Sequence, residues 1–385
     1  GGVSRDQGSM SARANHWQPG DDPGRRRFVT LAGSDGNGFS FEGGGHVPEV
    51  TVAYETWGEL NADRSNAVLV EHALTGDSHA TGDVGPGHAT PGWWNGLIGP
   101  GLAIDSDQFY VVCPNVLGGA QGTTGPSSIA ADGTPYGSRF PVITVRDQVA
   151  VEIAFADSLD IETWHAVVGG SMGGMRALEW AVEVPGRVAR LIVLSVGAAA
   201  TADQIAQSWL QIRAIKVDPN FRGGDYYDGA TPSEGLSIAR GLGQITYRTS
   251  EEFEVRFART AQDERSVLEG GQYAIESYLQ YHGEKLAQRF DANSYIVLSD
   301  AMNHHDVGRG RGGVAAALGT IRSQTTVLGI DSDRLYPLRL QDQLAELIRG
   351  ASHVHIISSA VGHDGFLLEV DQIGKIVGES LNASV

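Results

Sequence analysis

VVGGSMGGMRALEW, from Val167 to Trp180, joins a short apolar run to a glycine-rich turn and then to an amphipathic helical pattern. Residues 169–173, GGSMG, fit the pattern G-x-S-x-G, which is typical of a strand–turn–helix elbow that exposes a nucleophilic serine. Glycine occupies 52 of the 385 positions, so the pattern can also arise by chance. Ser171 is therefore a candidate nucleophile only if an acid and a histidine elsewhere in the chain can support it.

Short apolar runs rich in β-branched residues surround this segment and predict a parallel sheet. Helical patterns lie between several of them, such as residues 145–159, where Val149, Ile153 and Ala156 share one face. Continuous apolar strands that alternate with helices indicate an α/β fold, with a mostly parallel sheet covered by helices on both faces. The predicted strands are residues 50–57, 66–74, 109–115, 165–171 and 190–196 and, after a long interruption, 325–330 and 353–359.

Residues 200–322 interrupt the strands. Their sequence shows helical patterns and no strand pattern, which indicates a helical insertion. We therefore divide the chain into two parts of one core, residues 25–199 and 323–385, with the insertion between them. A helix over residues 338–350 joins the two strands of the second part. Residues 1–24 are polar and glycine-rich, and we expect a flexible tail there.

The composition indicates an ordinary globular protein and excludes some partners. Lys and Arg number 28 against 46 Asp and Glu, which gives a formal net charge of −18. Such a charge opposes nucleic acid and anionic membranes as partners, and no apolar run reaches the roughly 20 residues of a membrane span. Cys113 is the only cysteine, and the N-terminus lacks a signal-peptide pattern, so we expect a cytoplasmic protein.

Two segments near the C-terminus offer the partners that Ser171 needs. Asp331 and Asp333 follow the strand at 325–330, and His363 lies in a Gly-His-Asp-Gly turn after the next strand. Serine, acid and histidine occur in this chain order in strand–elbow–helix enzymes, and parallel strands end at one edge of the sheet. An aspartate after a strand is more often a turn former or helix cap, and spacing does not choose between Asp331 and Asp333.

An attacking serine also needs hydrogen-bond donors for the negative charge that develops on the carbonyl oxygen. The backbone N–H of Met172, next to the serine, is one candidate. The loop after the strand at 66–74 should supply the second, from Leu74 or from Thr75.

Other polar clusters are weaker candidates. His304, His305 and Asp306 are adjacent in sequence, and no further ligand is spaced to complete a metal site, so we predict no metal. Arg309 and Arg311 fit either a phosphate clamp or a solvated turn.

Taken together, the motifs resemble the homoserine O-acetyltransferases, which have the α/β-hydrolase fold. The resemblance runs in order from about residue 25 to the C-terminus. Ala120 departs from the family pattern, in which a cysteine is common. The matching segments are EHALTGDSHA at 71–80, GWWNGLIGPG at 92–101, CPNVLGGAQGTTGPSS at 113–128, GGSMGGMRALEW at 169–180, TYRT at 246–249, HHDVGRGRGG at 304–313, DSDRLYP at 331–337 and GHDGFLLE at 362–369.

The resemblance implies transfer of an acetyl group from acetyl-CoA, a co-substrate, to the hydroxyl of L-homoserine in methionine biosynthesis, with no resident cofactor. It assigns Ser171 as nucleophile, His363 as base and Asp333 as acid. The residues that it implies for the amino-acid end of the substrate are Thr75, Arg240, Tyr247 and Asp364.

The resemblance also implies that residues 200–322 form a lid domain through which the chain forms a homodimer. The alternatives are a homoserine O-succinyltransferase or a serine O-acyltransferase, which differ only in the substrates. An esterase or thioesterase would use water as the acceptor, and a non-catalytic scaffold of the same fold would use none of these residues.

Overall fold

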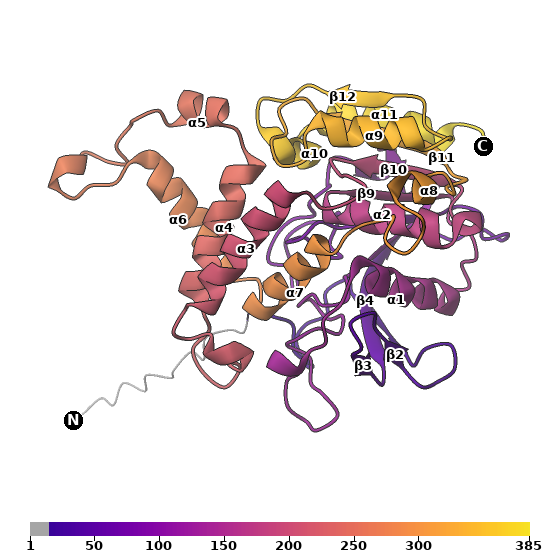
Figure 1. Ribbon diagram of the computed structural model, residues 1–385, viewed down its shortest axis with the longest axis horizontal. Coiled ribbons are helices and arrows are strands. Elements are labelled where there is room, and N and C mark those ends of the chain that lie inside the picture. Colours follow the sequence, from indigo (N-terminus) through magenta and orange to yellow (C-terminus); the bar gives the residue numbers. More distant parts are fainter. Residues whose placement is uncertain (1–14) are drawn as a thin grey trace, which may run out of the picture.

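A mostly parallel eight-stranded sheet lies at the centre of the computed structural model, which describes residues 15–385 (Figure 1). The strand order is β1-β4-β8-β5-β9-β10-β11-β12, and every neighbouring pair from β8 to β12 is parallel. β4 runs antiparallel to both of its neighbours, the edge strand β1 and β8. The bounds are β1 Arg27–Leu31, β4 Val50–Trp57, β5 Ala67–Glu71, β8 Tyr110–Pro114, β9 Ala166–Gly170, β10 Arg190–Leu194, β11 Gln324–Ile330 and β12 Val354–Ile357.

Successive side chains of the central strands enter two different hydrophobic cores, one on each face of the sheet. On β5, Leu69 packs in the core that contains helices α1 (Val145–Ser158), α2 (Met172–Glu183) and α9 (Leu338–Leu347). Its neighbours Val68 and Val70 pack in the opposite core, which contains α11 (Val370–Asn382). Both faces are covered, which is why these strands read as continuous apolar runs.

The chain between β10 and β11 forms helices α3 to α8, as predicted for a helical insertion. Helices α4, α5 and α6 project away from the sheet (Figure 1), with α3 packed on α4 and α4 on α6. Helix α8 packs against α9 of the core, so the end of the insertion has already returned to the core. The bounds are α3 Ala202–Lys216, α4 Ser233–Tyr247, α5 Ser250–Arg256, α6 Ala274–Ala287, α7 Ala292–Asn303 and α8 Val314–Leu318.

Residues 15–24 of the predicted flexible tail are held against the rest of the chain, and residues 1–14 lie outside the described residues. The Asn15 side chain donates a hydrogen bond of 2.8 Å to the carbonyl of Phe290. The backbone N–H of Trp17 donates one of 2.9 Å to the carbonyl of Ala120. This segment therefore links the insertion to the core, a contact that its polar composition did not indicate.

The sequence-based strands agree with the structure within a few residues, and the differences lie at the edge of the sheet and in the loops. β1 was not predicted, because its residues RFVTL are mostly exposed and show little apolar pattern. Within residues 15–385, no helix is both long and apolar enough to cross a bilayer. The other strands missed are very short: β2 Phe39–Ser40, β3 His46–Val47, β6 Ile98–Gly99 and β7 Ile104–Asp105.

Candidate active site

Ser171 lies in a sharp turn between the end of β9 and the start of α2. Its φ is +54°, a left-handed conformation that is strained for a residue with a side chain. The turn needs glycine on both sides. A Cβ on Gly169 would lie 2.3 Å from the carbonyl oxygen of Gly173, and a Cβ on Gly173 would lie 2.2 Å from that of Glu71. The strand, turn and helix form the nucleophile elbow that the sequence motif predicts.

The predicted acid and base lie beside this serine because β9, β11 and β12 run parallel and end at one edge of the sheet. The Oγ of Ser171 is 2.9 Å from Nε2 of His363, and Nδ1 of His363 is 2.7 Å from Oδ2 of Asp333. All three side chains are buried. Oδ1 of Asp333 accepts the backbone N–H groups of Leu335 and Tyr336, which fix the carboxylate.

The structure also separates the two candidate acids. Asp331 is exposed, and its carboxylate accepts a hydrogen bond of 3.0 Å from the backbone N–H of Ser359. It therefore shapes the loop between β11 and α9, and Asp333 is the residue that contacts His363.

Three aromatic rings surround the imidazole of His363. Tyr336 stacks on it with ring centroids 5.1 Å apart, Tyr247 lies at 6.0 Å, and Phe366 meets it edge-on at 5.2 Å. Burial raises the pKa of both Tyr247 and Tyr336, so both phenols are neutral. These rings limit the access of water to the imidazole and can stabilise its positive charge when it is protonated.

The predicted oxyanion donors lie in the same region. Met172 is the first residue of α2, so its N–H lies outside the internal hydrogen bonding of the helix. The side chains of Leu74 and Met172 are buried in one hydrophobic cluster, which holds the loop after β5 next to the elbow.

The predicted substrate residues line one cavity with Ser171 and His363. Its volume is about 100 Å³, and Thr75, Arg240, Tyr247 and Asp364 all contribute to its wall. Arg240 Nη1 donates a hydrogen bond of 3.1 Å to Thr75 Oγ1, and its guanidinium lies 5.5 Å from the centre of the Tyr247 ring. A larger cavity of about 530 Å³, between residues 16–19 and 120–136, contains none of the triad.

Two residues near this cavity were not assigned from the sequence. Arg248 donates from Nε to Oδ2 of Asp364 at 2.9 Å and pairs with Glu252, so it orients the carboxylate next to His363. Tyr336 contacts His363 and Asp333, as described above. Both lie in segments that match the family, TYRT and DSDRLYP, but the sequence alone does not reveal these contacts.

The two arginines of the segment 304–313 are paired with carboxylates. Arg309 contacts Glu42 at 2.7 Å, and Arg311 contacts Glu179 and Glu183. These ion pairs fit a structural turn better than a phosphate clamp. His305 is buried and bonded to the carbonyl of Gly197 at 2.8 Å.

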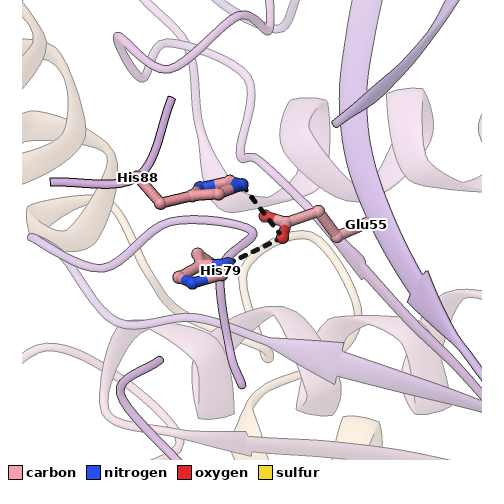
Figure 2. Close-up of side chains that lie close together, drawn as sticks. All are labelled: Glu55, His79 and His88. Atoms are coloured by element: carbon pink, nitrogen blue, oxygen red, sulfur yellow. Dashed lines mark hydrogen bonds and ion pairs between the residues drawn. The ribbon is translucent and has the colours of Figure 1, made fainter. Parts of the chain in front are cut away.

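Glu55, His79 and His88 form a buried cluster of possible metal ligands that the sequence did not indicate (Figure 2). The two imidazoles stack with centroids 3.8 Å apart and an angle of 7° between their planes. A metal lies in the plane of each imidazole that binds it, and two parallel planes this far apart share no point. Nε2 of His88 also accepts the backbone N–H of Arg25 at 2.9 Å. The cluster therefore does not fit a metal ion.

The pair His79–Glu55 is instead an internal ion pair. Nδ1 of His79 contacts Glu55 at 2.8 Å, and Nε2 contacts the carbonyl oxygen of Asp83 at 3.0 Å. Burial lowers the pKa of His79, but the hydrogen bond and negative charge of Glu55 outweigh it, and the net shift is upward. Ser78 donates to the second oxygen of Glu55 at 2.6 Å. The pair thus anchors the loop that begins at Leu74.

An elbow serine, a histidine and an aspartate at the carboxyl edge of a mostly parallel sheet define a member of the alpha/beta hydrolase fold. The family model of that description matches residues 66–370. Homoserine O-acetyltransferase from Thermobifida fusca is 57% identical over 367 residues, which cover 95% of this chain and 96% of the relative. The enzyme of that name from Clavibacter michiganensis is 53% identical over 373 residues and 95% of each chain. The chain belongs to the homoserine O-acetyltransferase family.

Solved structures agree in fold. Homoserine O-acetyltransferase from Bacillus anthracis superposes with a TM-score of 0.85 at 29% identity, covering 94% of this chain and 98% of that one. Esterase E22 gives a TM-score of 0.83 at 29% identity, with coverage of 93% and 99%. The fold is thus similar both to that of an acetyltransferase and to that of an esterase. The residues of the site must therefore distinguish acetyl transfer from hydrolysis.

Proposed function

We propose that this chain transfers the acetyl group of acetyl-CoA to the hydroxyl of L-homoserine through an acetyl-Ser171 intermediate, a step of methionine biosynthesis. The observation that carries the proposal is the presence of opposite charges, Arg240 and Asp364, on the cavity that contains Ser171. An amino acid offers a carboxylate to the arginine and an ammonium group to the aspartate. The names of the curated relatives support the same reaction.

In the first half-reaction, the acetyl group moves to the enzyme. Nε2 of His363 takes the proton of the Ser171 hydroxyl while Oγ attacks the thioester carbonyl carbon. The N–H groups of Met172 and Leu74 stabilise the oxyanion. The carbon–sulfur bond then breaks, the imidazolium gives its proton to the sulfur, and CoA leaves as the thiol. Asp333 holds the histidine in the required tautomer and stabilises the imidazolium.

In the second half-reaction, homoserine takes the place of CoA. His363 removes the proton of the homoserine hydroxyl, whose oxygen attacks the acetyl carbon. The bond to Oγ breaks, the proton returns to Oγ, and O-acetylhomoserine is released. Thr75 and Tyr247 complete the wall of the site around Arg240.

Hydrolysis is the competing function, and the similarity to esterase E22 makes it a specific alternative. Water needs no pair of opposite charges, so Arg240 and Asp364 favour an amino-acid acceptor. Residues 200–322, proposed as a lid, carry Arg240 and Tyr247, and together with the rings around His363 they limit the entry of water.

The experiment that tests the function combines acetyl-CoA or succinyl-CoA with homoserine, serine or water and identifies the products by mass. We expect O-acetylhomoserine as the main product. Serine lacks one methylene, a difference worth about 1–3 kcal/mol in a pocket, so it should react about 10- to 200-fold less efficiently. Free acetate as the main product in the presence of homoserine would contradict the proposal.

We also propose that the active form is a cytoplasmic homodimer that associates through the lid. Several large apolar side chains of α3 and α4, two helices packed on each other, are exposed in the single chain, and such exposure is typical of a protein interface. The buried Cys113 fits a reducing compartment. The exposed residues are Ile205, Trp209, Leu210, Ile238 and Ile245.

A further inference from the structure

A second cavity adjoins the one that contains Ser171. It has a volume of about 330 Å³ and lies between the lid helices α4 and α6 and the loops at residues 75–77 and 90–93 of the core. Thr75 and Arg240 line both cavities. The two cavities therefore meet at these two side chains.

The wall of this second cavity is basic although the protein is strongly acidic. His282, Lys285 and Arg289 lie at positions i, i+3 and i+7 on and just after α6, and so share one face of that helix. Lys285 is one of only three lysines in the chain, whose net charge is −18. One carboxylate, Asp77, lies in the wall, and its Oδ1 accepts the backbone N–H of His79.

Among the described residues, the cations of the wall have no acidic partner, in contrast to Arg309 and Arg311 of the same insertion. Within residues 15–385, no carboxylate oxygen lies within 4.0 Å of the charged nitrogens of Arg240, Lys285 or Arg289, whereas Arg309 and Arg311 are each paired. The two arginines of the wall converge on one residue. Arg289 Nη1 donates to the carbonyl of Thr75 at 2.8 Å, and Arg240 donates to its hydroxyl.

Burial and the like charges of the wall lower the pKa values of two of its basic groups. Burial and the charge of Arg240 lower the pKa of the Arg289 guanidinium to about 10. Burial and the neighbouring cations lower the pKa of His282 to about 4. Arg240 and Arg289 are partly buried and have no acidic partner in the described part of the chain, which is unfavourable in a folded protein, and a bound anion would relieve their repulsion.

We propose that the α6 row, defined as His282, Lys285 and Arg289, binds the phosphate groups of the acyl donor. The inference rests on the proposed function, because acetyl-CoA carries a diphosphate and a 3′-phosphate on the far side of a flexible arm from its thioester. The row extends over about 10 Å, at about 1.5 Å per residue, which suits a chain of phosphates. Arg240, at the junction of the two cavities, would bind the carboxylate of the acceptor and not a phosphate.

Lys285 is the residue to change, because its side chain is exposed and its ammonium group, within the described residues, contacts only the ring of Tyr281, one turn earlier on α6, whereas Arg289 supports Thr75. The variants are Lys285→Gln and Lys285→Glu, with Lys375→Glu on α11 as the matched control. Each is assayed with acetyl-CoA, with acetyl-dephospho-CoA and with the acetyl thioester of N-acetylcysteamine, which has no phosphate. The measured quantity is kcat/KM for each donor at saturating homoserine.

For Lys285→Glu we expect the ratio of kcat/KM for acetyl-CoA to that for the cysteamine thioester to fall about tenfold, and less for Lys285→Gln. The control should keep the wild-type ratio. Acetyl-dephospho-CoA keeps the diphosphate but lacks the 3′-phosphate. If its kcat/KM falls as much as that of acetyl-CoA, Lys285 contacts the diphosphate; if it falls less, Lys285 contacts the 3′-phosphate. An unchanged ratio would overturn the proposal.

Calorimetry with free CoA tests the phosphate site separately from the reaction. The Kd for CoA should rise about tenfold in Lys285→Glu, while the Kd for pantetheine, which lacks the phosphates, should not change. If the wild type makes no O-acetylhomoserine but the Kd for CoA still rises, the proposed function fails and the phosphate site stands. If the Kd for CoA is unaffected, the phosphate site is wrong whatever the reaction.

Discussion

Arg240, on helix α4 of the insertion, donates a hydrogen bond of 3.1 Å to the hydroxyl of Thr75, in the loop that follows the core strand β5. Leu74, the residue before it, is the proposed second oxyanion donor. The contact therefore joins the part of the chain that would recognise the acceptor to the part that would stabilise the transition state. It also lies where the two cavities meet.

Replacement of Arg240 by alanine should raise the KM for homoserine by about 10- to 100-fold, because a charge-assisted hydrogen bond to the substrate carboxylate is lost. Formation of the acetyl-enzyme should continue. Steady-state kinetics gives the KM, and the burst of CoA release gives the first half-reaction. Arg213→Ala, an exposed arginine on α3, is the control. If the rates of both half-reactions decrease equally, Arg240 acts mainly by supporting Thr75.

Removal of the Tyr336 ring should expose His363 to water. In Tyr336→Ala we expect a lower kcat for transfer and a larger share of free acetate among the products, because the stacked ring no longer excludes water. The loss of a large buried side chain should also cost about 3–5 kcal/mol of stability. Tyr336→Phe keeps the ring and serves as the control. If the two variants give the same ratio of O-acetylhomoserine to free acetate, the ring does not control hydrolysis.

The residues of the triad could be predicted because each follows its own strand, and parallel strands bring their carboxyl ends together. Ser171 and His363 each had one candidate position, although the G-x-S-x-G pattern alone could also arise by chance. Asp331 and Asp333 were not, since both follow β11 and only the backbone N–H groups of Leu335 and Tyr336 show which carboxylate turns inward. The family resemblance, rather than spacing, chose Asp333.

Contacts between distant segments could not be predicted in this way. Arg248 reaches Asp364 across 116 positions, and no periodic pattern encodes that meeting. The stack of His79 on His88 depends on how the loop after β5 folds back, and the order at residues 15–24 depends on partners in the insertion. In each case a polar side chain was placed by a surface that forms only after the chain has folded.

The His79–Glu55 pair should make stability depend on pH. The folded pKa of His79 is raised, so its contribution is fully present below its unfolded pKa of about 6.5 and is lost as the pH rises through the folded value. Urea titrations from pH 6 to 9 measure the free energy of unfolding. In His79→Asn this free energy should fall less with rising pH than it does in the wild type. His304→Asn, an exposed histidine, is the control. A decline equal to that of the wild type would contradict the ion pair.

Glu55→Gln should be the more damaging change in the same cluster. It leaves the buried His79 without its counter-charge, and the loss of one partner of a buried pair typically costs about 3–5 kcal/mol. The melting temperature should fall accordingly. EDTA should leave the melting temperature of the wild type unchanged, because the stacked imidazoles cannot share a metal; a marked fall with EDTA would reinstate the metal site.

The proposed dimer places Trp209, which is 59% exposed in the single chain, in an interface. Trp209→Glu should therefore shift the mass measured by light scattering from the dimer toward the monomer, since a buried unpaired charge opposes association. Val255→Glu on α5, at a position that is 91% exposed, should have no effect. A wild-type chain that is monomeric at micromolar concentration would refute the proposal.

The most direct test of the central claim is rapid mixing of the protein with acetyl-CoA in the absence of homoserine. We predict a burst of free CoA thiol equal to the concentration of active sites, and a mass increase of one acetyl group on the peptide that contains Ser171. Ser171→Ala should give neither signal. If CoA appears only when homoserine is also present, and Ser171 never carries an acetyl group, then the acetyl-serine mechanism is wrong.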